Sequence, residues 1–442
     1  MIKKNKMPIN TQPNETINFH KFMSKHFKTD SMRGNCFGFS HMAMRAILQG
    51  MQGVAQFNQR ANKINTLLSQ NKLTDIFSSN DNQKPYDISA FFDGVELFQH
   101  IKRYPELYIG NISHQDAGAE IVTAILDKSL ELEMQNNRII SGSGVYDKNH
   151  LQIFFSFLKK LMTQEKQTST IPALMLKSTN HAICIGYLSE ESKWLFFDIN
   201  KSMSILLYDK IEDLAHNIVS SLSATSIAVF SYNLFLKGIL PTDERAKPIL
   251  TWNLAMRVVL FSNIQQKMMM QDSNGVSWLF IAAQDGQTEI VKSLCENGAN
   301  INQASKLGLR PLQIAIFNGH SEITKFLSQK ITDNNLQNQN LMLFVLLSLI
   351  EYTNNIQQLL QTNTNDGLKN KAHHTTKTLT GDDNHIKMNP LLQREPRISN
   401  KKIYHVRENS RTPAFWNEAI LSKQLTHTAQ KITYSAHTLC PN

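Results

Sequence analysis

A repeat in the C-terminal half constrains this chain more than any other feature. The stretch Gly275–Ala283 (GVSWLFIAA) matches Gly308–Ile316 (GLRPLQIAI), and Gly286 matches Gly319 at the same offset of 33 residues. The glycines suit tight turns, and the alanines allow two helices to approach each other closely. A repeat of this length predicts pairs of helices that stack on one another and bury their apolar sides together.

The repeated pattern resembles that of ankyrin repeats, because EIVKSLCENGANIN, which completes the first copy, follows the ankyrin consensus nearly throughout. The resemblance implies an all-α solenoid that binds a protein partner. We place the repeats at 272–365, with two clear copies and a degenerate one at 339–362, and a helical linker or cap at 239–271. The side chains that we expect to contact the partner are Trp278, Phe280, Arg310 and Gln313.

Residues 31–238 have a different pattern, in which helices come first and strands follow. Apolar residues recur at helical spacing after Cys36, and ISAFFDGVELFQHIKRY and HLQIFFSFLKKLM also favour helices. Short runs rich in branched and aromatic residues then predict an antiparallel sheet: 171–178, 181–188, 193–200, 203–209 and 224–233. Helices followed by strands, without regular alternation, indicate an α+β domain.

Three residues of this domain are typical of a thiol hydrolase. Cys36 stands at the predicted start of a helix, where the helix dipole and unpaired N–H groups favour a thiolate. His181 begins one predicted strand and Asp198 ends the next, and the short SEES connection brings both to the same end of the sheet. Each residue alone is more often structural, but the ordered set indicates a nucleophile, a base and an orienting carboxylate.

The order Cys–His–Asp, the helix start NCFGFS and the pair NHAICIGY and WLFFDIN resemble the YopT/AvrPphB-type cysteine proteases, which have a papain-like fold. The resemblance covers about residues 20–235. It implies that Cys36 is the nucleophile, His181 the general base and acid, and Asp198 the orienting carboxylate.

One position departs from the pattern of that family. Papain-like enzymes usually place a glutamine about six residues before the nucleophile, where it donates a hydrogen bond to the oxyanion. This chain has Asp30 there, and a carboxylate is a poor donor. Asn35 or a backbone amide must therefore substitute, so Asn35 and Asp30 are the candidate oxyanion residues.

Proteases of this type are delivered into host cells by bacterial pathogens, and their combination with ankyrin repeats resembles effectors of type IV secretion systems. The resemblance implies a virulence effector in the host cytoplasm, whose repeats bind a host protein and whose protease domain acts on a protein substrate. Such effectors often carry a polar C-terminal secretion signal. The tail at 366–442, with 12 basic and 6 acidic residues, fits that description. Residues 1–30 are polar, and we expect them to form a flexible leader.

Composition bears on the partners and the compartment. The net charge of +10 is spread thinly, so we expect no nucleic-acid partner. Four cysteines without pairing or metal-ligand spacing predict a reducing compartment and no metal or other cofactor. The N-terminus lacks the apolar core of a signal peptide, and the most apolar run, Leu341–Ile350, is too short to span a bilayer. We therefore expect secretion without a signal peptide and no transmembrane segment.

Two alternatives to a protease remain open from the sequence. The same three residues support deamidation or acyl transfer, because these reactions differ in the nucleophile that reaches the acyl-enzyme. In the second alternative the papain-like domain is a relic, and the chain is a non-catalytic effector that binds its partner through the ankyrin repeats.

Overall fold

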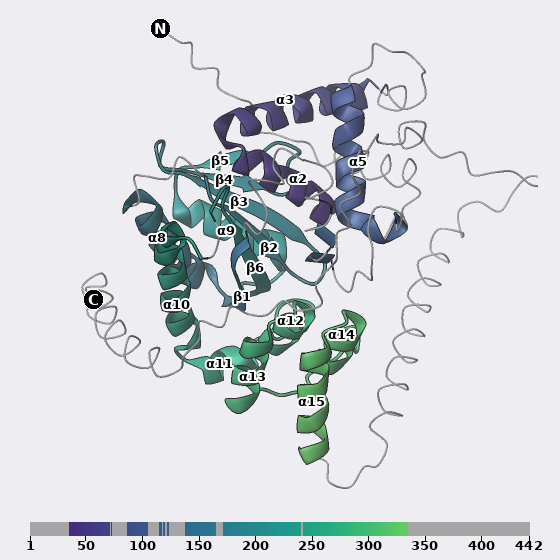
Figure 1. The fold of residues 1–442 in the computed structure, drawn as a ribbon, viewed down its shortest axis with the longest axis vertical. Helices are drawn as coiled ribbons and strands as arrows, with labels where there is room; N and C mark the ends of the chain where they lie inside the picture. Colours follow the sequence, from purple (N-terminus) through teal and green to yellow (C-terminus); the bar gives the residue numbers. More distant parts are fainter. Residues whose placement is uncertain are drawn as a thin grey trace, which may run out of the picture.

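The computed structural model describes residues 35–70, 72, 86–104, 115–116, 118–119, 122, 138–164, 171–239 and 242–334. Three predicted segments lie outside the described residues: the leader at 1–30, the degenerate repeat at 339–362 and the tail at 366–442. Within the described part, a mixed helix and sheet region is followed by helices toward the C-terminal end (Figure 1). The predicted mixture of helix and sheet is therefore confirmed, whereas the papain-like fold stays a prediction.

The strands form one six-stranded sheet with the order β1-β6-β2-β3-β4-β5. Their bounds are β1 Arg138–Tyr146, β2 Ala173–Lys177, β3 Ala182–Leu188, β4 Lys193–Phe197, β5 Leu206–Tyr208 and β6 Ala228–Phe235. Every neighbouring pair is antiparallel, as the branched and aromatic runs predicted. Those runs coincide with five of the six strands, although β6 continues two residues beyond its run, and the strand that was not predicted is β1.

Strand β1 contains the sequence SGSG, which has none of the branched and aromatic residues typical of strands. Its Gly142 pairs with Tyr232 on β6, and a Cβ atom at Gly142 would lie 2.5 Å from the Tyr232 hydroxyl oxygen. The glycine therefore makes room for the tyrosine ring of the neighbouring strand.

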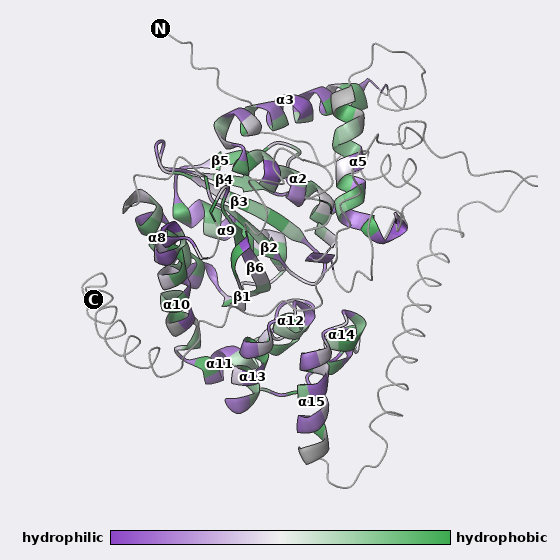
Figure 2. Ribbon diagram, in the orientation of Figure 1, coloured by the Kyte–Doolittle hydropathy of each residue, from purple (hydrophilic) through white to green (hydrophobic). Residues whose placement is uncertain are grey.

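Helices cover both faces of the sheet (Figure 1). The helices are α2 Cys36–Leu48, α3 Gly50–Ser69 and α5 Tyr86–His100 with its 3-10 continuation η1 Ile101–Arg103, and α8 Lys148–Gln164 and α9 Ile211–Leu222. Helices α2, α3 and α5 share one core with Met175 and Phe197 of the strands. Helices α8 and α9 share another core with Leu174 and Phe196. Adjacent strand residues thus point to opposite cores, and the strands are mostly hydrophobic along their length in Figure 2.

Helix α2 packs closely on α5 and on the sheet. A Cβ atom at Gly38 would lie 2.2 Å from the carbonyl oxygen of Val95, so only glycine permits this approach of α2 to α5. Gly50 has a φ of 81°, which separates α2 from α3 and favours glycine. These two glycines set the position of the helix that begins at Cys36.

The described C-terminal part consists of helix pairs. After the 3-10 turn η3 Glu244–Ala246 come α10 Lys247–Phe261 with α11 Ile264–Met269, α12 Trp278–Gln284 with α13 Thr288–Glu296, and α14 Pro311–Phe317 with α15 Ser321–Asn334. Ser277 begins α12 as its N-cap, because its hydroxyl oxygen accepts a hydrogen bond from the amide of Phe280 at 3.2 Å. Gly286 and Gly319 have φ values of 70° and 73°, as the predicted tight turns require.

These helix pairs are joined to the sheet by one continuous core. The buried residues of α12, α13 and α14 belong to the same apolar cluster as α8, α9 and one face of the sheet. Trp278, the first residue of α12, is fully buried, and its Nε1 donates a hydrogen bond to Ser143 Oγ on β1 at 3.2 Å. The array is therefore packed against the sheet and is not a separate domain on a tether.

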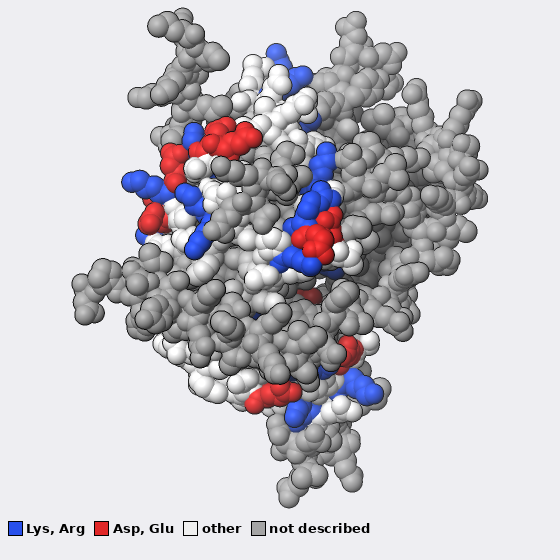
Figure 3. Space-filling model, turned by 60° about the vertical axis from the view of Figure 1, so that its left-hand side comes forward, with Lys and Arg blue, Asp and Glu red and all other residues white. Residues whose placement is uncertain are grey.

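Charged side chains of both signs share the surface. On the face in Figure 3, Lys and Arg lie beside Asp and Glu, and the described residues there form no single continuous basic surface. Exposed pairs such as Lys292 with Glu322, 2.9 Å apart, contribute little to stability. None of the helices that the structure describes combines the length and the apolar character needed to cross a bilayer.

The shared core predicts how the molecule unfolds. In Trp278→Ala we expect the free energy of unfolding to fall by about 3–5 kcal/mol, the usual cost of truncating a buried tryptophan. Sheet and array should lose structure in one urea transition followed by circular dichroism. In the control Phe317→Ala, whose ring is 65% exposed, the change should stay within about 0.5 kcal/mol. Separate transitions of sheet and array in the wild type would contradict the shared core.

Candidate active site

Cys36 is the first residue of α2 and is half-buried. Its Sγ lies 3.9 Å from the carbonyl oxygen of Asn180, which places the sulfur beside the turn that precedes β3. The helix start keeps donors free: the amide of Gly38 donates to Gln99 Oε1 at 3.0 Å, but among the described residues the amides of Cys36 and Phe37 have no acceptor. The predicted position of Cys36 at a helix N-terminus is confirmed.

His181 and Asp198 meet where β3 begins and β4 ends. The two strands pair antiparallel, with Cys184 opposite Phe197, and this pairing brings the flanking residues together. His181 Nε2 lies 2.8 Å from Asp198 Oδ1, and both side chains are buried. Asp198 Oδ1 also accepts the amide of Asn200 at 2.9 Å, which fixes the orientation of the carboxylate.

A short turn holds His181 against the end of β2. The amide of Ser178 donates to the carbonyl oxygen of His181 at 2.9 Å, and the amide of His181 donates to Ser178 Oγ at 3.2 Å. The same turn carries Asn180, whose carbonyl oxygen faces Cys36. Ser178 was not identified from the sequence, although a serine between two strands is a common turn residue.

The charges around His181 favour its protonated form. Burial lowers the pKa of His181, but the hydrogen bonds and negative charges of Asp198 and Cys36 outweigh it and raise the pKa to about 10. Burial raises the pKa of Asp198, but the hydrogen bond and charge of His181 hold it below its usual range. Because Nε2 is bonded to Asp198, Nδ1 is the ring nitrogen left for Cys36. The structure thus brings the three predicted residues together as Cys36–His181–Asp198.

The two oxyanion candidates have different outcomes. Asp30 lies outside the described residues. Asn35 is buried directly before Cys36, its side chain makes no cap hydrogen bond, and its Oδ1 has no partner in the described structure. Gln99 of α5, which sequence analysis missed because it is distant in the chain, also lies at this helix start through its bond to Gly38.

The four side chains predicted to bind a partner do not form an exposed face. Trp278 packs on β1 through Ser143, and Phe280 is buried in the same core. Gln313 is buried at the start of α14, where its Oε1 accepts the amide of Arg310 at 2.7 Å, and Arg310 is half-buried. This corrects the expectation for Trp278, Phe280 and Gln313, because these helices face the sheet and one another.

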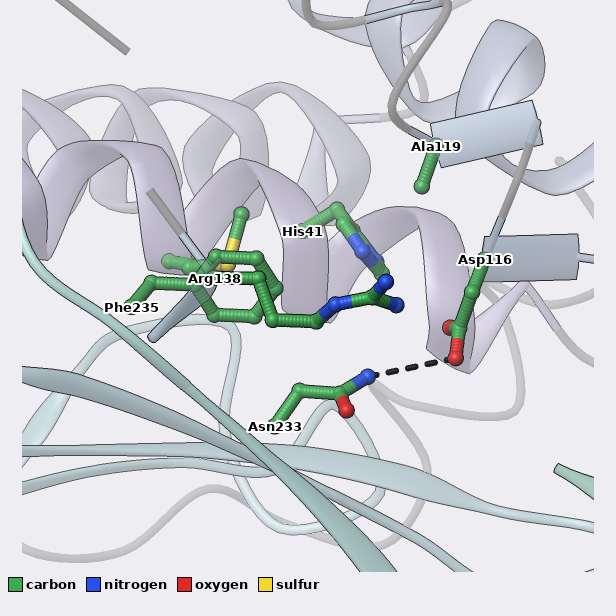
Figure 4. A pocket seen from close by; sticks show the side chains of 7 residues that line it. His41, Asp116, Ala119, Arg138, Asn233 and Phe235 are labelled. Atoms are coloured by element: carbon green, nitrogen blue, oxygen red, sulfur yellow. Dashed lines mark hydrogen bonds between the residues drawn. The ribbon is translucent and has the colours of Figure 1, made fainter. Parts of the chain in front are cut away.

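A small cavity lies between α2 and the sheet. Figure 4 shows His41 above it and Arg138, Asn233 and Asp116 around it, with Asn233 Nδ2 donating to Asp116 Oδ2 at 3.2 Å. The free space is about 30 Å³, which admits one or two water molecules and no substrate. Burial lowers the pKa of His41 to about 4, so this imidazole is neutral at neutral pH.

The raised pKa of His181 predicts a pH-dependent stability. The pKa rises on folding from an ordinary 6.5 to about 10, so the stabilisation is complete below about pH 6.5 and is lost as the pH rises through about 10. Between these values, the free energy of unfolding should decrease more steeply for the wild type than for Asp198→Asn. Urea unfolding at about pH 6, 8 and 10 measures both slopes. Equal slopes would show that Asp198 does not hold the imidazolium.

Comparison with known proteins concerns the C-terminal helix pairs. A profile of the ankyrin-repeat family matches residues 253–338 in three copies, which begin within α10 and so include helices that the sequence suggested as a linker or cap. An ankyrin repeat-containing protein of Schizosaccharomyces pombe is 34% identical over 62 residues, or 14% of this chain. The chain spans 30% of the length of that relative. This chain therefore contains ankyrin repeats at residues 253–338, and these indicate a role in protein–protein interaction.

Proposed function

We propose that the chain is a thiol hydrolase with a papain-like N-terminal domain that acts on a protein substrate. One observation carries the proposal: the imidazole of His181 is held between the carboxylate of Asp198 and the thiol of Cys36. A carboxylate, an imidazole and a thiol in this sequence of contacts form the usual arrangement of a nucleophile, its base and the group that orients the base.

The geometry supports a two-step acyl transfer. The Cys36 thiolate attacks the substrate carbonyl carbon, and His181 gives its proton to the leaving nitrogen as the C–N bond breaks. A water molecule then transfers a proton to His181 while its oxygen attacks the thioester, which releases the acid and regenerates the thiolate. Throughout, Asp198 keeps the ring oriented and stabilises its positive charge.

The helix start supplies the groups for the negative oxygen of each intermediate. The amides of Cys36 and Phe37 have no acceptor among the described residues, so they are available to a developing oxyanion. The side-chain Nδ2 of Asn35, the residue directly before Cys36, is a further candidate donor beside them. Deamidation and acyl transfer use the same groups and differ in the molecule that attacks the thioester.

The ankyrin repeats indicate that the chain also binds a protein. We propose that the chain is a bacterial effector, that the bound protein belongs to the host, and that the chain works in the reducing host cytoplasm after export without a signal peptide. The resemblance of the Cys36, His181 and Asp198 motifs to translocated cysteine proteases supports this setting. The free thiols of Cys36, Cys184 and Cys295 are compatible with it.

Alkylation with iodoacetamide tests the proposed chemistry without a known substrate. We expect Cys36 to be labelled rapidly at neutral pH, and the rate to fall by about 100-fold or more in His181→Ala and in Asp198→Asn, because the charge pair is lost. Cys295 is the internal reference, since burial raises its pKa to about 11. Peptide mapping by mass spectrometry gives each rate.

Asp243→Asn, which changes a partly exposed carboxylate that pairs with Arg245, is the matched control and should label like the wild type. If Cys36 reacts no faster than Cys295, or if its rate is the same in His181→Ala, the proposed hydrolase is refuted. The chain would then be an ankyrin-repeat binding protein with an inactive domain.

A further inference from the structure

We propose that the ankyrin array positions the catalytic histidine, through an ion pair between Asp285 of the array and Lys177 at the end of β2. The inference deepens the proposed function and rests on it. It makes Asp285 and Lys177 positioning residues, which act on His181 through the turn that connects β2 to β3.

A row of polar residues crosses the sheet. Ser143 on β1 pairs with Ser231 on β6, and Ser231 pairs with Lys177 on β2. The first residue of α12 and the residue that caps its C-terminal end both contact this row: Trp278 Nε1 donates to Ser143 Oγ, and Ser231 Oγ donates to Asp285 Oδ2. The array is thus attached to three adjacent strands through one line of side chains.

The ammonium group of Lys177 lies at the end of this row. Lys177 Nζ lies 2.7 Å from Asp285 Oδ2 and 2.5 Å from Asp116 Oδ2, and all three side chains are largely buried. Burial lowers the pKa of Lys177, but the two carboxylates outweigh it and raise the pKa, so the ammonium stays charged. A buried ammonium between two carboxylates holds its partners tightly, because each charge is costly to bury alone.

Lys177 connects this row to the candidate active site. Lys177 pairs with Ala182 on β3, so the turn from Ser178 to His181 is closed directly beyond the ion pair. Ala182 is also the residue whose carbonyl oxygen accepts a hydrogen bond from Ser40 Oγ of α2, at 2.8 Å. The row therefore continues from the array to the histidine turn and to the helix that carries the nucleophile.

The array in turn fixes the place of Asp285. This residue ends α12, and the carbonyl oxygen of its neighbour Gln284 accepts Asn318 Nδ2 at 2.8 Å and bonds to His320 Nε2 at 2.9 Å. A Cβ atom at Gly286 would lie 2.6 Å from the ring of His320. The next repeat thus clamps the turn that carries Asp285, and a partner that displaced this turn would act on His181.

Substitution of the ion pair in the full-length protein tests the inference. Asp285→Asn removes one charge but leaves an acceptor for Ser231, and Lys177→Met removes the ammonium. We expect the alkylation rate of Cys36 to fall roughly 10- to 100-fold in both, the effect of a small misplacement of catalytic groups. Lys177→Arg should recover most of the rate. The double variant Lys177→Met with Asp285→Asn should lose less than the two single losses combined.

The matched control is Lys292→Met, which removes a surface lysine of the array whose ion-pair partners among the described residues are Glu289 and Glu322. It should label at the wild-type rate. Amide hydrogen exchange gives a second readout, independent of thiol chemistry: the amides of Ser178 and His181 should exchange faster in Asp285→Asn while the strands remain protected.

The outcomes separate the two proposals. If Asp285→Asn labels at Cys36 and exchanges its turn amides at the wild-type rates, the positioning role is overturned. This holds even if Cys36 of the wild type is reactive and depends on His181, as the proposed hydrolase requires. A Cys36 that is unreactive in the wild type would refute the proposed hydrolase. Hydrogen exchange of the Ser178 and His181 amides would then show whether Asp285 holds the turn. Faster exchange in Asp285→Asn supports the positioning role, and unchanged exchange overturns it.

Discussion

The candidate site depends on one buried interaction, the bond between His181 Nε2 and Asp198 Oδ1. The interaction exists because β3 and β4 pair in a register that brings the residue before one strand next to the residue after the other. A carboxylate this deeply buried is stable only with a charged or hydrogen-bonded partner, and His181 is that partner. Cys36 completes the group from a different element. Helix α2 packs on the same two strands, and its first residue, Cys36, lies beside the turn at Asn180.

The sheet joins this site to the ankyrin repeats. One face packs on α2, α3 and α5, and the other continues through α8 and α9 into the helices of the array. Trp278 and Phe280, which an isolated array would be free to offer to a partner, are buried in that core. The array therefore has two roles in this account: it binds a protein, and its helix α12 supports the strands from which the histidine turn extends.

The sequence predicted the parts of this structure that depend on local pattern. The helix at Cys36, the strands that carry His181 and Asp198, and the period of the repeats all follow from the spacing of apolar residues, as does the pairing of β3 with β4 through a short connection. Strand β1 was missed because it contains SGSG, in which Gly142 makes room for the ring of Tyr232 on a strand far away in the chain. Gln99, Lys177 and Asp285 were missed for a similar reason: their partners are distant in sequence, and only packing brings them together. The same cause misplaced Trp278, since the array pattern does not reveal what covers it.

The protonation state of His181 tests the central claim most directly, because the claim is that Asp198 and Cys36 together hold this side chain as a cation. Nitrogen-15 NMR of protein labelled at histidine, with His181 assigned by comparison with His181→Gln, reports whether each ring nitrogen carries a proton. The account predicts that at about pH 8 both nitrogens of His181 are protonated, whereas the buried His41 is neutral. A neutral His181 ring at that pH would contradict the account.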